Sequence, residues 1–130
     1  MKNEIDVYFD EEGDFFEITR KENVKGYAEE RDEGIFTLIE EKTKKEIGVG
    51  ILPFKERIEN GELKIEYNKE DDSATFSFYP QANSKADETI KISDEVTFTF
   101  HKKSLRSITM LNASKLLNEK VIEEAVVINF

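Results

Sequence analysis

The chain has 130 residues, which fits one domain or two very small ones that share a core, and this length excludes a large multi-domain enzyme. With 19 Lys and Arg against 29 Asp and Glu, the net charge is -10, so an average surface repels nucleic acid phosphates and anionic lipid headgroups. The sequence has no cysteine and one histidine, which excludes disulfides, thiolate metal sites and cysteine nucleophiles and argues against a histidine-assisted triad. We therefore expect a non-catalytic protein without a cofactor that binds neither nucleic acid nor a membrane.

The start of the chain gives no sign of export. The sequence MKNEIDVYFDEEGD carries acidic residues and no apolar run of the roughly 7 to 15 residues that a signal peptide needs. No stretch approaches the roughly 18 consecutive apolar residues of a membrane span. A cytoplasmic location is the resulting expectation, and the lack of cysteine agrees with it. Aromatic residues make up 11% of the chain, which favours a packed core over disorder.

An internal repeat organises the chain. Residues 5 to 18, IDVYFDEEGDFFEI, and residues 63 to 76, LKIEYNKEDDSATF, share an apolar alternation and an acidic turn at an offset of 58. Apolar residues at every second position, such as Ile5, Val7 and Phe9, predict half-buried strands joined as a hairpin. The side chains of Asp10 and Asn68, at the turn entries, are expected to accept hydrogen bonds from N–H groups inside the turns.

The parallel continues downstream with small shifts. DEGIFTLIEE at 32 to 41 matches DEVTFTFHKK at 94 to 103, an offset of 62, and GVGILP at 48 to 53 matches SITMLN at 107 to 112, an offset of 59. The turn dipeptide Asn60-Gly61 predicts the boundary, so residues 1–59 form the first repeat and residues 60–130 the second repeat plus a C-terminal helix. The predicted strands are 3–9, 14–21, 34–40 and 46–53 in the first unit, and 62–68, 73–80, 88–101 and 105–112 in the second.

A helix is predicted after the last of these strands. Asn112 or Ser114 can cap it, and a row of apolar residues then lies along one side: Leu116, Leu117, Val121 and Ala125. The helix is expected to end near Glu124, and the final AVVINF either extends it or forms a short strand, which the periodicity leaves open.

A four-stranded meander has one apolar face and is too small to stand alone. We therefore expect a mainly β fold in which two repeated four-stranded antiparallel meander units pack as a sandwich or partly open barrel. The two units would share one core and form a single globular domain, with the C-terminal helix covering an edge or an end.

The repeated segments also resemble a known family. IDVYFDEEGDFFEI, GYAEERDEGIFTLIEE and EIGVGILP resemble a small prokaryotic domain of unknown function, family 2283, and ITMLNASKLL in the second unit is similar to that family's ending in an apolar strand, Asn-Ala-Ser and a short helix. Two tandem copies would cover nearly the whole chain. The second copy departs from the pattern, with Val96 aligned to Gly34 and Ser73-Ala74 aligned to Phe15-Phe16. The resemblance implies a fold and brings no activity with it.

Acidic residues are the main candidates for a functional surface. Two groups stand near predicted turns of the first unit: Asp10, Glu11, Glu12 and Asp14, then Glu29, Glu30, Asp32 and Glu33. The first group could offer oxygen ligands to Ca²⁺ or Mg²⁺ but lacks the spacing of a calcium loop, so a hairpin turn is favoured. The second group could pair carboxylates for hydrolysis of a sugar, but the chain has no Trp for a sugar platform, so a solvated loop is favoured.

Other chemical candidates have simpler interpretations. His101 is expected to point away from the face that carries Phe98 and Phe100, as a surface residue without a nucleophile beside it. The GVG sequence at 48 to 50 lacks the third glycine of a phosphate-binding loop and does not open a helix, so strand glycines at a bulge or close approach are favoured. Lys42, Lys44 and Lys45 are expected to be solvated turn charges.

The charge is distributed unevenly between the units. Residues 1 to 59 hold 17 acidic and 10 basic residues, net -7, whereas residues 60 to 130 hold 12 and 9, net -3. The leading hypothesis is a protein-protein interaction or regulatory module whose acidic face, formed by the two acidic groups of the first unit, binds a basic protein, with a homodimer as another form of the interaction. The alternative is a small-ligand or divalent-metal binding module with its site between the two repeats.

Overall fold

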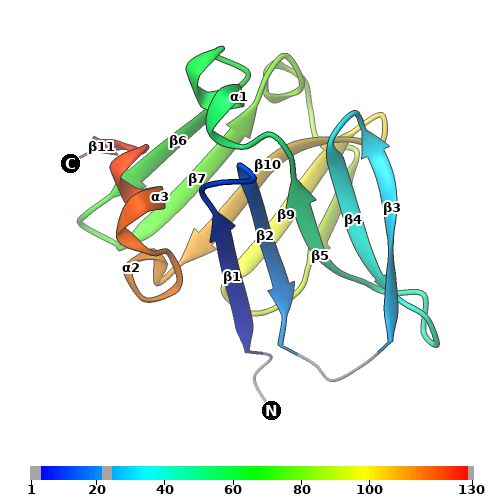
Figure 1. Cartoon of the computed structure of the whole chain (residues 1–130). Helices are drawn as coiled ribbons and strands as arrows, with labels where there is room; N and C mark the ends of the chain where they lie inside the picture. The colour runs from blue at the N-terminus through cyan, green and yellow to red at the C-terminus, as the bar shows by residue number, and fades with distance from the viewer. Residues whose placement is uncertain (1–3, 22–24, 129–130) are drawn as a thin grey trace.

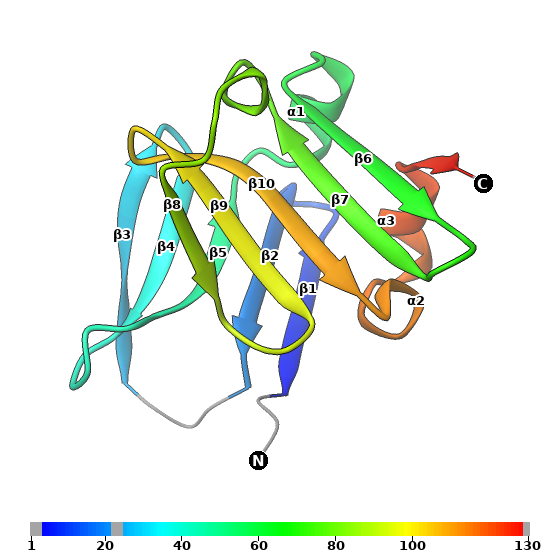
Figure 2. The same ribbon diagram turned by 180° about the vertical axis from the view of Figure 1, so that it is seen from behind.

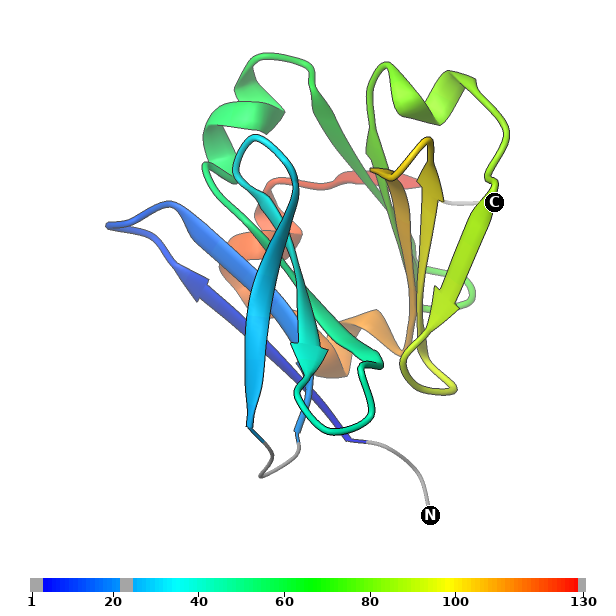
Figure 3. The same ribbon diagram turned by 90° about the vertical axis from the view of Figure 1, so that its right-hand side faces the viewer.

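A computed structural model describes residues 4–21 and 25–128. Two β-sheets pack face to face as a sandwich, and they are seen edge-on in Figure 3. The first sheet has the strand order β1-β2-β5-β4-β3 and is antiparallel throughout. Its strands are β1 (Ile5–Asp10), β2 (Phe15–Arg20), β3 (Gly26–Asp32), β4 (Ile35–Glu40) and β5 (Glu46–Ile51).

The second sheet repeats this arrangement. The strand order β6-β7-β10-β9-β8 is antiparallel, and a sixth strand, β11, is added at the edge, parallel to β6 (Figure 2). The strands are β6 (Leu63–Asn68), β7 (Ser73–Phe78), β8 (Glu88–Lys91), β9 (Val96–His101), β10 (Ser104–Leu111) and β11 (Val126–Ile128). Because β1 and β3 remain free edges of the first sheet, the fold is a sandwich and not a closed barrel.

Besides the strands, the described part of the chain contains four short helical segments (Figure 1). Helix α1 (Lys55–Glu59) joins the sheets, and a 3-10 turn, η1 (Gln81–Asn83), follows β7. Helices α2 (Ala113–Leu116) and α3 (Glu119–Glu123) lie at the side of the sandwich, where α2 contacts β1 and β7. Within residues 4–21 and 25–128, no helix is long and apolar enough to cross a membrane.

One core joins the two sheets. The ring of Phe16 from β2 stacks on that of Phe54 at 4.3 Å between centroids and on that of Phe76 from β7 at 5.6 Å. All three side chains are fully buried, and they belong to one cluster that also holds Ile18, Ile65 and further apolar residues of both sheets. Neither sheet therefore buries its inner face without the other.

The strand pairing confirms that the two sheets are similar. Phe9 lies opposite Phe16 in the first sheet, and Tyr67 lies opposite Ala74 in the second, which reproduces the offset of 58. The fifth strand of each unit also carries an irregularity in its pairing with the preceding strand, at Ile47 in β5 and at Arg106 in β10. The two units therefore share both their strand pairing and the position of this irregularity, which is of the kind that a β-bulge produces.

The predicted number of four strands per unit was wrong, because among the described residues the first unit has five strands and the second has six, counting β11, and neither is a meander. The missing strand of the first unit is β3, whose residues from Gly26 to Glu30 are exposed and therefore show no apolar alternation. In the second unit the single strand predicted at 88–101 is two strands, β8 and β9, separated at a turn where the Ser93 hydroxyl accepts the N–H groups of Glu95 and Val96, each at 3.1 Å. In both units the second strand pairs with the fifth, so the third and fourth form an outer hairpin.

The predicted offset of 62 for the middle strands was wrong by one residue. Ile35 lies opposite Ile51 and Val96 lies opposite Met110, so Ile35 corresponds to Val96 and the offset is 61. A shift of one residue exchanges the two faces of a strand, and Phe36 therefore corresponds to Thr97 and not to Phe98. The comparison of the two repeats aligned Gly34 with Val96 only because the predicted offset was one residue too large.

The predicted single C-terminal helix was also wrong, since α2 and α3 are separate. The backbone of Leu117 is extended, and the Asn118 side chain accepts the N–H of Val121 at 3.0 Å to begin the second helix. This break lets Leu117 and Val121 both reach the core. Of the two alternatives for the final AVVINF, the structure has the short strand, β11, at residues 126 to 128. Residues 129 and 130 of this segment, and residue 3 of the predicted first strand, lie outside the described residues.

Candidate functional site

The first acidic group lies at the turn between β1 and β2, where Asp14 has a structural role. Its carboxylate accepts hydrogen bonds from the backbone N–H groups of Lys55 at 2.6 Å and Glu56 at 3.1 Å, which begin α1. Its backbone oxygen also accepts the N–H of Phe54 at 2.9 Å. Because unpaired N–H groups at a helix start need an acceptor, Asp14 caps α1 from a distant turn.

Asp72 has the same role in the second unit. Its carboxylate accepts bonds from the N–H of Ser114 at 3.0 Å and from the Ser114 hydroxyl at 2.7 Å, at the start of α2, and its backbone oxygen accepts the N–H of Ala113 at 2.9 Å. The Tyr67 hydroxyl donates a further bond at 2.6 Å, and this bond, followed by those from Ser114, lowers the pKa of Asp72. Asp14 and Asp72, aligned in the sequence repeat, therefore tie each hairpin to the helix that follows the fifth strand of its unit.

Removal of the Asp72 carboxylate is expected to destabilise the fold by about 1 kcal/mol at neutral pH, the usual effect of losing a helix cap. Because the pKa of Asp72 is lowered on folding, this contribution is present above its unfolded pKa of about 3.9 and is lost as the pH falls through the lower folded pKa. Urea unfolding of Asp72→Ala at neutral pH and near pH 2 would measure the difference.

The matched control is Asp94→Ala, which removes an exposed carboxylate from the β8–β9 turn. The control is expected to leave the unfolding midpoint nearly unchanged at both pH values. An equal loss of stability in Asp72→Ala at neutral and acidic pH would contradict the assigned role of the carboxylate.

The other acidic residues of the predicted face are spread over two hairpins. Glu11 forms an ion pair with Lys120 of α3 at 2.9 Å, and this contact raises the pKa of Lys120. Asp10 is half-buried at the end of β1, and Glu12 is exposed in the turn. The structure therefore leaves Glu12 available at this hairpin, while Glu11 and Asp14 are engaged within the molecule.

The second acidic group lies on β3 and the following turn, and the loop predicted for Glu29 and Glu30 is an edge strand. Glu29 lies opposite Thr37, whose side chain is buried, whereas Glu30 lies opposite the half-buried Phe36, so the two carboxylates belong to opposite faces of the sheet. Asp32 and Glu33 belong to the β3–β4 turn region, where the Asp32 carboxylate accepts the N–H of Glu33 at 3.0 Å.

Arg31, in the middle of this acidic group, connects the two sheets, which the sequence did not indicate. Its guanidinium lies 4.0 Å from the centre of the Phe100 ring and forms ion pairs with Glu88 at 2.9 Å and with Glu46 at 3.3 Å. These contacts of the Arg31 guanidinium join β3 and β5 of the first sheet to β8 and β9 of the second. Part of the acidity near β3 is thereby neutralised inside the sandwich.

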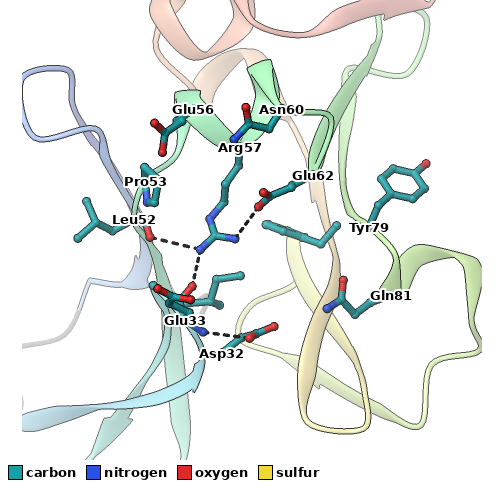
Figure 4. Close-up of a pocket in the computed structure, with 13 residues that line it drawn as sticks. Asp32, Glu33, Leu52, Pro53, Glu56, Arg57, Asn60, Glu62, Tyr79 and Gln81 are labelled. Atoms are coloured by element: carbon teal, nitrogen blue, oxygen red, sulfur yellow. Dashed lines mark hydrogen bonds and ion pairs between the residues drawn. The ribbon is translucent and has the colours of Figure 1, made fainter.

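A pocket of about 580 Å³ lies between the two units, beside α1 (Figure 4). Its wall from the first unit includes Asp32, Glu33 and Leu52, and its wall from the second includes Tyr79 and Gln81. The pocket is large enough for a small molecule. The pocket lies between the two repeats, and ligand binding there stays the alternative prediction from the sequence.

Arg57 of α1 connects several parts of the pocket wall. Its guanidinium donates to the backbone oxygens of Glu33 and Leu52 and pairs with Glu62 at 3.2 Å (Figure 4). The pocket thus combines this engaged cation with the carboxylates of Asp32, Glu33, Glu56 and Glu62. Within residues 4–21 and 25–128, no group of three or more His, Cys, Asp or Glu side chains is placed to hold a metal ion.

The remaining candidates occupy ordinary positions. Phe98 and Phe100 are buried, and His101 lies on the opposite face, as predicted, with its Nδ1 atom 2.8 Å from the Lys85 backbone oxygen. Gly48 and Gly50 lie within β5 and not in a phosphate-binding loop, which confirms their interpretation as strand glycines. Lys44 lies beyond β4, with its ammonium group 5.2 Å from the centre of the Tyr27 ring.

Comparisons with known proteins give no relative for this fold and this pocket. No protein-family model matches the chain, no curated protein matches it, and no solved structure matches it. The resemblance to family 2283 accordingly stays a prediction from the sequence.

Proposed function

We propose that the chain is a non-catalytic interaction module that binds a positively charged protein through one acidic end of the sandwich. This end, called the acidic end, is where the β1–β2 turn, the β3–β4 turn and α1 lie, whereas the β4–β5 turn lies at the other end (Figure 1). It is defined by five carboxylates: Glu12, Asp32, Glu33, Glu56 and Glu59. A cytoplasmic location, as predicted from the sequence, is part of the proposal.

The pairing of charges at the acidic end is the observation that supports this function. Among the described residues, none of its five carboxylates forms an ion pair, whereas the neighbouring cations are already engaged: Lys55 with Glu124 at 3.5 Å, Arg57 with Glu62 and Lys120 with Glu11. The uncompensated carboxylates give this end a negative potential. A surface of this kind accelerates encounter with a partner of opposite charge.

The pocket beside α1 adds to the acidic end and does not require a separate function. Asp32, Glu33 and Glu56 belong both to its lining and to the acidic end. A lysine or arginine side chain of the partner can therefore enter the hollow between the two units and meet several carboxylates there. Binding of a free small molecule or a divalent metal in this pocket stays a prediction from the sequence.

Neutralising the acidic end is expected to abolish capture of the partner. The natural chain should retain a protein with a basic surface at low salt and release it at about 0.5 M salt, where charges are strongly screened. The variant that combines Asp32→Asn, Glu33→Gln and Glu56→Gln should capture at least about ten-fold less of it, as measured by quantitative mass spectrometry.

The matched control combines Glu66→Gln, Glu70→Gln and Asp94→Asn in the second unit. It removes the same number of charges away from the acidic end and is expected to keep the partner. Thermal unfolding of both variants checks that each is folded. If the two variants capture the same protein equally well, or if the captured protein is not released by salt, the proposed function is wrong.

A further inference from the structure

The outward faces of the two sheets can be compared residue by residue, because the strands pair in the same register. One row crosses all five strands of the first sheet, and the pairing places each of its members opposite the next: Tyr8, Glu17, Gly50, Phe36 and Glu30. The equivalent row of the second sheet is Glu66, Thr75, Thr109, Thr97 and Lys91. The same architecture thus carries different side chains on its two outer faces.

The outer face of the first sheet is apolar at its centre. Gly50 leaves room for two rings, since a Cβ atom built there would lie 3.2 Å from the Phe15 ring and 4.0 Å from the Phe36 ring. The Tyr8 ring lies 6.5 Å from that of Phe15, and Leu52, directly after β5, has 40% of its surface exposed. None of these side chains belongs to the core cluster, and Tyr8 is 56% exposed.

The second sheet shows that the fold does not need these aromatic side chains. At the positions equivalent to Phe15, Phe36 and Leu38, it has Ser73, Thr97 and Thr99. At these three positions its outer face therefore carries hydroxyl groups, as is usual for a sheet that faces solvent. Since strand order and register are the same in both sheets, the apolar centre of the first is not required for strand pairing.

The charged side chains on this outer face have one sign. On the five strands of the first sheet, the outward charged residues are all acidic: Asp6, Asp10, Glu17, Glu30 and Glu40. The outer face of the second sheet instead has Lys64, Lys91 and Arg106 against Glu66. Burial, followed by repulsion from Asp6, raises the pKa of Glu17, and no cation among the described residues pairs with that carboxylate.

We propose that the outer face of the first sheet docks a segment of another protein in which apolar side chains are flanked by lysine or arginine. The apolar side chains would cover Phe15, Phe36 and Leu52, and the cations would meet Glu17 and the surrounding carboxylates. A second copy of the same face is a poor occupant, because it would set two groups of like charges against each other. This inference rests on the proposed function and adds an apolar requirement to the partner.

Two synthetic peptides of equal charge, KLKFKLK and KSKSKSK, test the inference against the ¹⁵N-labelled full chain by NMR titration. KLKFKLK is expected to shift the amide signals of Phe15, Phe36 and Gly50 and to bind at least about ten-fold more tightly than KSKSKSK. Any binding of KSKSKSK is expected to be centred on the acidic end.

The variant that combines Phe15→Ser and Phe36→Thr gives the first sheet the residues of the second. It is expected to remove the difference between the peptides, whereas the control with Thr75→Ala and Thr97→Ala on the second sheet keeps it. Equal, salt-sensitive binding of both peptides at the acidic end would overturn the docking face and leave the proposed function standing. Absence of shifts at Phe15 and Phe36 with either peptide would also overturn the docking face, whatever the acidic end does.

Discussion

Gly34→Ala is expected to destabilise the protein by at least about 3 kcal/mol, because a side chain there meets backbone and not a movable group. A Cβ atom at Gly34 would lie 1.8 Å from the Leu52 carbonyl oxygen, and the residue has a φ of +76°. Its own carbonyl oxygen accepts the N–H of Leu52 at 2.7 Å, so the two chain segments cannot separate without losing that bond. The substitution would push the β3–β4 turn away from β5 at the edge of the pocket.

Gly61→Ala is the matched control for this prediction. Gly61 has a nearly identical φ of +78°, but nothing lies within 4 Å of an added Cβ atom. Its substitution is expected to cost only the conformational penalty of about 1 kcal/mol. Chemical denaturation of the two variants measures both values. Equal losses would show that the Leu52 backbone yields to the side chain, and the steric explanation would then be wrong.

The apolar alternation predicted the strands that contribute to the core and failed for the one that does not. In β2 and β7 every second residue is buried, so Phe16, Ile18 and Phe76 reveal both the strands and their inner face. Strand β3 is exposed over most of its length, and within its sheet it pairs with β4 alone. An edge strand rich in acidic residues has the composition of a loop, and only the partner strand distinguishes the two.

The sequence predicted the acidic turns, but it did not indicate that two of their carboxylates accept hydrogen bonds at the starts of helices. The repeat aligned Asp14 with Asp72, yet their partners, such as Lys55 and Ser114, lie in helices of four or five residues without a periodic signal. A contact between a turn and a distant helix start depends on the tertiary fold. The sequence therefore placed Asp14 on an exposed acidic face and indicated no role for Asp72, whereas both carboxylates cap helices.

The apolar outer face had a signal that was available in the sequence. Phe15-Phe16 in β2 and the run IFTLI at 35 to 39 place large apolar residues on both faces of a strand. One face of such a strand is accounted for by the core, and the other needs a second explanation. The predicted offset of 62 concealed it, because it matched the outward Phe36 to the buried Phe98.

Phe76→Ala is expected to destabilise the protein by about 3 to 5 kcal/mol, the usual range for truncating a buried phenylalanine. Phe76 is fully buried, and its ring stacks on Phe16 from the opposite sheet and lies 6.4 Å from the ring of Phe54. The cavity would open between the sheets, which cannot close around it without moving whole strands. For a domain with a stability of about 5 to 15 kcal/mol, this loss is a large part of the total.

Phe36→Ala, on the outer face of the first sheet, separates stability from binding. Phe36 is half-buried and lies outside the core cluster, so its truncation is expected to cost less than about 1 kcal/mol in urea unfolding. The two variants should then differ in what they lose. Phe76→Ala loses stability, whereas Phe36→Ala keeps its stability and loses tight binding of the KLKFKLK peptide. If Phe36→Ala is as unstable as Phe76→Ala, its ring serves to hold the first sheet together, and the case for a docking face is lost.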